Sequence, residues 1–176
     1  KQISRYIVKN LKSGGKPQLI YICTHNSRRS HFGQLWAQVS AYYFQIEPFA
    51  SYSGGTEATA FHPHAIRAAR EAGFEVTEKE SGVNPIYEVS YASNTPPMEV
   101  FSKKYDQSPN PSKSFGAIMT CSSADADCPL VLGADLRVAT TYEDPKAFDN
   151  TPLEEEQYGE RCRQIATETA FVFKSL

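Results

Sequence analysis

The 176-residue sequence lacks an excess of positive charge, because 20 aspartates and glutamates outnumber 18 lysines and arginines. Nucleic-acid-binding proteins present a basic surface to the phosphate backbone, so a net charge of -2 argues against nucleic acid as a partner. No apolar run approaches the roughly 20 residues that span a bilayer, and no basic start leads into an apolar secretory core. We therefore expect no contact with a membrane and a cytoplasmic location.

Cysteine is also scarce, with four residues at positions 23, 121, 128 and 162. A chain of this length with so few cysteines does not depend on a disulfide framework. In a reducing compartment all four would remain thiols, which makes their positions a question of chemistry. No CxxC or HxxxH pattern accompanies them and the four histidines are scattered, so we expect no metal site.

What the sequence does contain is an ordinary globular composition, with 40% hydrophobic and 22% charged residues. This predicts a single domain over residues 1–176 with a sizeable core. Strand-like and helix-like segments alternate, which predicts an α/β fold with a mainly parallel sheet. The expected helices are 1–11, 30–44, 64–72 and 152–176, and the expected strands are 19–23, 49–53, 116–121 and 137–141. A turn is expected over 53–57.

Residues 19–36 form the most informative stretch, because an apolar strand ends at Cys23 and a short polar loop leads into an amphipathic helix. The N–H groups of such a loop and of the first helical turn converge on one point, where the helix dipole favours an anion. The positive field would favour the thiolate form of Cys23, which is the nucleophilic form. Arg29 can hold two oxygens of a tetrahedral oxyanion with its planar guanidinium.

The bare spacing of Cys23 and Arg29 is a weak signal, since a buried cysteine and a surface arginine would give the same pattern. The strand before, the helix after and Ser30 at the helix start favour the oxyanion site. Asn26 is expected to brace the loop or to adopt a left-handed conformation. Ser30 is expected to hydrogen-bond the Cys23 thiolate, and Arg28 either to face solvent or to help bind the anion.

The octapeptide CTHNSRRS, residues 23–30, resembles the phosphate-binding loop of the low-molecular-weight protein tyrosine phosphatases and of the related thioredoxin-coupled arsenate reductases. Segments 53–58, 62–66, 71–76 and 143–145 also resemble motifs of this superfamily, in the same order. The resemblance covers most of residues 17–83 and 115–176. It implies a four-stranded parallel sheet flanked by helices, with residues 1–16 as a helical extension and residues 82–115 as an insertion.

The same resemblance implies the roles of individual residues. Cys23 would be the nucleophile, Arg29 the oxyanion clamp and Asp144 the acid that assists the leaving oxygen. The oxyanion would be bound by the loop residues Thr24, His25, Asn26, Ser27, Arg28, Arg29 and Ser30. Some reductases of the superfamily hold potassium with a glutamate where this chain has Gln34, so no potassium site is expected.

Cys121 and Cys128 resemble the resolving pair of the arsenate reductases, although a structural cysteine after a strand and an incidental one in a helix would give the same pattern. Seven residues of intact helix rise about 10.5 Å. A disulfide needs Cα atoms within about 7 Å, so this pair can bond only if residues 122–127 unwind or form a loop. The resemblance implies an external dithiol such as thioredoxin as reductant and no tightly bound cofactor.

Three functions remain open on the sequence. The first is an arsenate reductase with a three-cysteine relay, and the second is a phosphatase that hydrolyses phosphotyrosine or small phosphate esters. Lys146 and Ala147 stand where many phosphatases carry two tyrosines, which weakens the phosphotyrosine alternative. The third is a non-enzymatic oxyanion-binding or redox-sensing module. Residues 82–115 contain a predicted hairpin, 87–91 with 98–101, that would pack over the sheet edge, extend the sheet or form a homodimer surface.

Overall fold

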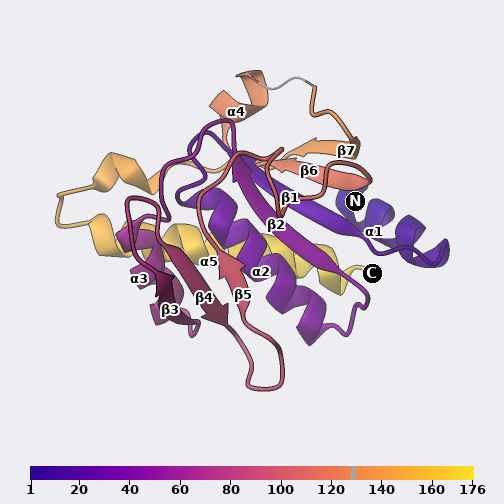
Figure 1. Ribbon diagram of the computed structural model, residues 1–176, viewed down its shortest axis with the longest axis horizontal. Helices are drawn as coiled ribbons and strands as arrows, with labels where there is room; N and C mark the ends of the chain where they lie inside the picture. The colour runs from indigo at the N-terminus through magenta and orange to yellow at the C-terminus, as the bar shows by residue number, and fades with distance from the viewer. Residues whose placement is uncertain (128–129) are drawn as a thin grey trace.

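The computed structural model describes residues 1–127 and 130–176. A central sheet of four strands has the order β2-β1-β6-β7, with all three pairings parallel (Figure 1). These strands are Gln18–Cys23 (β1), Ala50–Gly55 (β2), Phe115–Met119 (β6) and Ala134–Ala139 (β7). The predicted α/β fold with a four-stranded parallel sheet is confirmed. Because β1 lies between two neighbours, its carboxyl end at Cys23 is central in the sheet.

Helices lie on both faces of this sheet, as predicted. Leu19 and Tyr21 of β1 face the helices Gln2–Lys12 (α1), Arg29–Tyr43 (α2) and Glu154–Lys174 (α5). Ile20 and Ile22 face the opposite side, where they pack with the helix Ser122–Asp127 (α4) and with Val131. Alternation of side chains along β1 therefore fills two cores from one apolar run.

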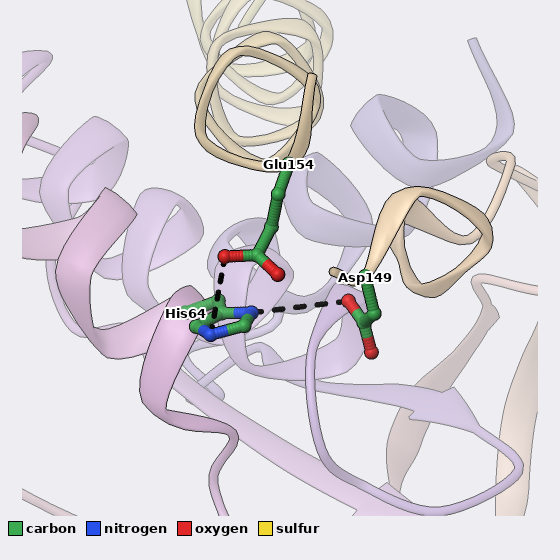
Figure 2. Close-up of side chains that lie close together, drawn as sticks. All are labelled: His64, Asp149 and Glu154. Carbon is green, nitrogen blue, oxygen red and sulfur yellow. Dashed lines mark ion pairs between the residues drawn. The ribbon is translucent and has the colours of Figure 1, made fainter. Parts of the chain in front are cut away.

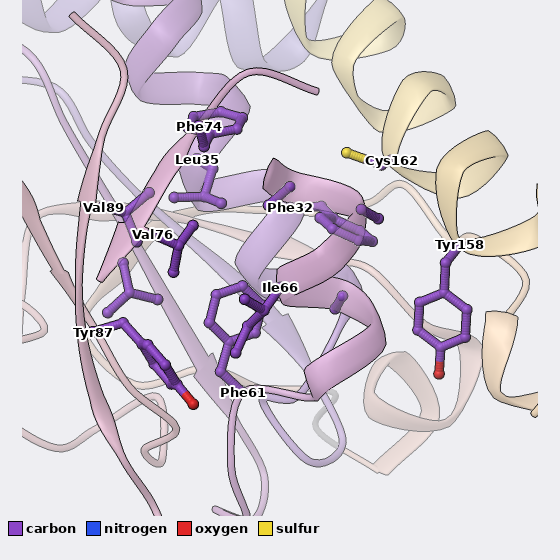
Figure 3. Close-up of a cluster of buried hydrophobic side chains, with 14 of the residues drawn as sticks. Phe32, Leu35, Phe61, Ile66, Phe74, Val76, Tyr87, Val89, Tyr158 and Cys162 are labelled. Atoms are coloured by element: carbon purple, nitrogen blue, oxygen red, sulfur yellow. The ribbon is translucent and has the colours of Figure 1, made fainter. Parts of the chain in front are cut away.

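A second, antiparallel sheet joins Glu75–Glu80 (β3), Ile86–Ser90 (β4) and Met98–Val100 (β5). The predicted hairpin is confirmed as β4 and β5, and the central sheet is not extended by it. The small sheet packs against α2 and the helix Pro63–Glu71 (α3), and Figure 3 shows Val76, Tyr87 and Val89 turned toward Leu35 and Ile66. One face of the small sheet therefore belongs to a hydrophobic core that it shares with α2, α3 and α5.

Some boundaries differ from the sequence prediction. The strand β2 continues to Gly55 where a turn was expected, because each of its residues pairs with β1 up to the match of Gly55 with Cys23. The strand β7 ends at Ala139 rather than at residue 141. Within the two described ranges, every helix is too short or too polar to cross a lipid bilayer.

Candidate active site

The loop after β1 turns its carbonyl groups toward the surrounding scaffold. The Thr24 carbonyl accepts from the Glu57 N–H at 2.8 Å, and the Ser27 carbonyl accepts from the His62 N–H at 3.0 Å. The His25 carbonyl accepts from the hydroxyls of Thr59 and Ser102 at 3.1 and 3.0 Å. In a trans peptide the N–H of the next residue points the opposite way. The loop N–H groups therefore face its concave side, as an oxyanion site requires.

Two backbone features let the loop take this shape. A Cβ atom on Gly55 would lie 2.6 Å from the Thr24 carbonyl oxygen and 2.7 Å from the Asn26 nitrogen, so the loop rests directly on a bare backbone. Asn26 has a φ of 45°, the left-handed conformation that was expected of it.

Cys23 lies next to Ser30, as expected, and Asn26 bonds Ser30 in turn. Its Sγ lies 3.1 Å from the Ser30 Oγ, and the Asn26 Nδ2 donates to the same Oγ at 2.9 Å. Because the oxygen accepts from Asn26, the Ser30 hydroxyl hydrogen is available to point at the sulfur. Ser30 does not cap α2, because the helix begins one residue earlier, at Arg29. Its hydroxyl contacts the Cys23 sulfur instead.

Arg29 is paired with the residue expected to act as acid. Its Nη2 donates to the Asp144 Oδ2 at 2.6 Å, and its Nη1 donates to the Tyr142 carbonyl at 2.8 Å. Its Nε is buried with no hydrogen-bond partner among the described residues. Asp144 begins the 3-10 helix Pro145–Phe148 (η1), where its Oδ1 also accepts from the Lys146 N–H. Within the described part of the chain, the Nε–H of the guanidinium is therefore free, whereas Nη2 is held by a carboxylate.

A pocket of about 410 Å³ brings distant segments to this loop. It is lined by Thr24, His25, Arg29, Cys121, Ser122, Ser123, Thr141, Tyr142, Glu143 and Asp144. Cys121 follows β6, and its Sγ lies 3.5 Å from the Thr24 Oγ1 and accepts from the Ala124 N–H in the first turn of α4. The structure thus places Cys121 beside the loop, while Cys128 lies outside the described residues.

Arg28 does not face solvent, so that expectation was wrong. Its side chain is buried, and its Nε donates to the Tyr158 hydroxyl at 2.8 Å. That hydroxyl donates to the Asp149 Oδ1 at 2.7 Å, and the Arg28 Nη2 lies 3.6 Å from Asp149 Oδ2. A buried guanidinium needs a paired carboxylate, which Asp149 supplies from the end of η1, and the bond to Tyr158 ties the loop to α5. Its partners come more than 115 residues later, so the sequence carried no signal for them.

A second polar cluster adjoins this network, in which His64 lies between Glu154 and Asp149 (Figure 2). The two carboxylates approach different ring nitrogens, at 3.2 and 3.8 Å. Glu154 also lies 3.6 Å from Arg67, and Asp149 is held by Arg28 and Tyr158. These donors already balance both carboxylates, so the cluster links α3 to the start of α5.

His31, in the first turn of α2, lies fully buried beneath the loop. Burial, followed by the positive charge of Lys103, lowers the pKa of His31 to about 3. Its Nδ1 lies 3.1 Å from the Ser53 hydroxyl. The neutral ring therefore belongs to the support of the loop. Cys162 is equally buried in α5, where it accepts from the Trp36 indole N–H, and burial raises the pKa of Cys162 to about 11.

Comparisons with known proteins agree with this arrangement. An arsenate reductase of Bacillus cereus (strain Q1) is 24% identical over 153 residues, 86% of this chain and 95% of the relative. An arsenate reductase of Bacillus licheniformis is 34% identical over 68 residues, 39% of this chain, and the match spans less than half (46%) of the relative. No protein-family model matches the chain.

Solved structures extend the similarity to three dimensions. A low-molecular-weight phosphotyrosine phosphatase from Vibrio cholerae covers 90% of this chain and 95% of its own, with a TM-score of 0.61 and 12% identity. The chain has the low-molecular-weight phosphatase fold. An arsenate reductase in its phosphate-binding state covers 90% of this chain and 98% of its own, with a TM-score of 0.58 and 16% identity. The resemblance to this superfamily, expected from the sequence, is confirmed.

Sequence reasoning missed several residues around the site. Tyr158 lies in the helix expected over 152–176 and was given no role at the site, yet its hydroxyl bonds Arg28 and Asp149. Ser102 and Lys103, from the segment expected as an insertion, contact the loop directly. A sequence separation of 77 residues with no motif left these two contacts without a signal.

Proposed function

We propose that this protein is an arsenate reductase whose Cys23 attacks an arsenate held by the loop N–H groups and Arg29. One observation carries the choice of reductase over phosphatase. Cys121 opens into the same 410 Å³ pocket as Arg29 and Asp144, with its sulfur beside Thr24. Hydrolysis of a phosphate ester has no use for a second thiol at this place.

The proposed reaction balances with three thiols and one external dithiol. The Cys23 thiolate bonds to arsenic, and an oxygen leaves as water with a proton from Asp144. The Cys121 thiolate then attacks the Cys23 sulfur and breaks the S–As bond, whose electron pair reduces arsenic to arsenite. Cys128 next attacks Cys121, which frees Cys23 and leaves a Cys121–Cys128 disulfide. Because residues 122–127 form the helix α4, this step requires α4 to unwind. A dithiol of the thioredoxin type reduces that disulfide and is itself oxidised.

The position of Cys121 at a helix start supports this role. Its sulfur accepts a hydrogen bond from the Ala124 N–H at 3.3 Å, in the first turn of α4. The relay also needs thiols that stay reduced between turnovers, so we propose the cytoplasm as its compartment.

The test is to mix reduced protein with arsenate, block free thiols and map disulfides by mass. A Cys121–Cys128 disulfide that forms with arsenate and not with phosphate supports the reductase. In Cys121→Ser it should be lost, whereas Cys162→Ser should still form it, because Cys162 lies in the core between α2 and α5. Rapid ester hydrolysis that persists in Cys121→Ser, without any arsenate-dependent disulfide, would instead establish the phosphatase.

The phosphatase remains the second candidate on one specific observation. The pair of Arg29 and Asp144 closes over the loop, and both residues serve phosphoryl transfer equally well. In that case water would hydrolyse a phosphocysteine on Cys23. In η1, which follows Asp144, Lys146 and Ala147 stand where an aromatic pair would contact a phosphotyrosine substrate.

A further inference from the structure

Residues Phe101–Lys103, which follow β5, run along the back of the oxyanion loop. The Lys103 N–H donates to the Asn26 Oδ1 at 2.9 Å, and the Ser102 hydroxyl donates to the His25 carbonyl at 3.0 Å. Beyond these contacts, the Gly55 N–H donates to the Lys103 carbonyl at 2.9 Å. This strap therefore bonds both the loop and the strand on which the loop rests.

The bond to Asn26 leads directly to the nucleophile. The Asn26 Oδ1 is occupied by Lys103, which fixes the amide so that its Nδ2 donates to Ser30. Ser30 in turn contacts the Cys23 sulfur. The orientation of the hydroxyl that serves Cys23 thus depends on a main-chain N–H that is 80 residues away in the sequence.

Ser102 is itself held on three sides. Its hydroxyl accepts from the Thr59 N–H at 2.8 Å while it donates to His25. The Asn84 side chain makes two hydrogen bonds to the Ser102 main chain. Its Nδ2 donates to the carbonyl at 2.7 Å, and its Oδ1 accepts from the N–H at 3.2 Å. A hydroxyl so fixed can hold the His25 carbonyl outward and its neighbouring N–H inward.

The Lys103 side chain is an unusual element of the strap. It is only 3% exposed, and its ammonium donates to the Phe101 carbonyl at 3.3 Å and lies 4.6 Å from the Phe101 ring centroid. No carboxylate lies within ion-pair distance of it among the described residues. A buried ammonium without a paired carboxylate is costly to keep, and its field acts on His31 beneath the loop.

We propose that Ser102 and Lys103 are positioning residues of the oxyanion loop, and that the buried Lys103 ammonium strengthens anion binding from behind. The inference rests on the proposed function only in taking the loop as an oxyanion site. In the low-dielectric interior a unit charge attracts the bound anion more strongly than it would at the surface. The strap thereby gives the segment after β5 a part in the chemistry of Cys23.

The test uses inorganic phosphate as the probe and the alkylation rate of Cys23, read by mass, as the signal. Lys103→Met keeps the main-chain bond to Asn26 and removes the charge. We expect about three- to tenfold weaker protection by phosphate. Lys104→Met removes the same charge from the exposed neighbour and should stay within twofold of the wild type.

Ser102 supplies a second, independent pair of variants. Ser102→Ala should weaken phosphate protection at least threefold, and Ser102→Thr should restore it, because the hydroxyl returns. The proposal is overturned if phosphate protection in both Lys103→Met and Ser102→Ala stays within twofold of the wild type. It is also overturned if Ser102→Thr is protected no better than Ser102→Ala. These readouts need no turnover, so a failed arsenate reaction leaves them intact. A wild-type loop that binds no phosphate overturns both proposals.

Discussion

Arg29 and Asp144 form an ion pair across the mouth of the oxyanion pocket, with 2.6 Å between Nη2 and Oδ2. The proposed clamp for the anion and the proposed acid for its leaving oxygen are therefore ion-paired with each other. Arg28 lies 3.9 Å from the same carboxylate, so two guanidinium groups share Asp144. Under the proposed mechanism, an oxyanion that binds Arg29 through both Nε and Nη2 would compete with Asp144 for Nη2, which would couple binding to the release of the acid.

We expect Asp144→Asn to separate binding from turnover. Loss of the acid should slow turnover about 100-fold or more. Phosphate should bind a few-fold more tightly, because the guanidinium no longer has to leave a carboxylate. Glu143→Gln is the matched control, since Glu143 lines the same pocket, whereas Arg29 bonds Tyr142 and Asp144. Weaker phosphate binding by Asp144→Asn would contradict the competition.

Arg28→Met should destabilise the fold by about 3 kcal/mol, because it leaves Asp149 and the Tyr158 hydroxyl without their buried cation. Urea denaturation measures this loss. Arg5→Met, at an exposed position of α1, should change the free energy of unfolding by less than about 0.5 kcal/mol. In a double-mutant cycle, adding Asp149→Asn to Arg28→Met should cost less than the two single losses together.

His31 should make the protein sensitive to acid. Burial lowers the pKa of His31 to about 3, below the 6.5 of the unfolded chain, so the unfolded state binds more protons between pH 6.5 and 3. The free energy of unfolding should therefore decrease as the pH drops from 6.5 to 3, by on the order of 3 to 5 kcal/mol. His31→Gln should flatten the pH dependence of the urea midpoint, whereas His25→Gln, at a half-exposed position, should not.

Lys103 should affect stability in the opposite pH range. Burial lowers the pKa of Lys103 to about 8 against an opposing effect of Glu99 on β5, and the other titratable group that it faces is His31 on α2. The unfolded chain then binds more protons between pH 8 and 10.5, so stability should rise with pH through this window.

At pH 7 the Lys103→Met variant should therefore be more stable than the wild type, by about 2 to 3 kcal/mol, while it binds phosphate less tightly. Thermal and urea unfolding measure the gain, with Lys104→Met as the neutral comparison. A Lys103→Met protein that is less stable at pH 7 and unchanged at pH 10 would contradict the linkage.

Gly55→Ala should damage the loop through space alone. The added Cβ would lie 2.2 Å from the Glu57 carbonyl oxygen and 2.6 Å from that of Thr24, both backbone atoms that cannot rotate away. We expect a loss of about 3 kcal/mol in stability and weaker phosphate protection of Cys23. Gly159→Ala in α5 meets nothing within 4 Å and should stabilise the protein by about 0.5 to 1 kcal/mol.

Much of this arrangement was predictable because local rules apply to it. The apolar run at residues 19–23 fixed β1, and the polar residues after it fixed a loop and a helix start. Asn26 and Ser30 could be assigned because a left-handed turn and a nearby hydroxyl are properties of adjacent residues. The bounds of β2 and the burial of Arg28 could not, because both depend on partners distant in the chain.

The sequence by itself determined that a cysteine and an arginine share one loop between a strand and a helix, which it predicts to bind an oxyanion, since seven consecutive residues carry that information. Only the tertiary structure decided what surrounds the loop: Cys121 in its pocket, Tyr158 behind Arg28, and Lys103 behind Asn26. The physical reason is that Cys121 lies after β6, Tyr158 in α5 and Lys103 after β5, three segments far from the loop in sequence that reach it only when the chain has folded.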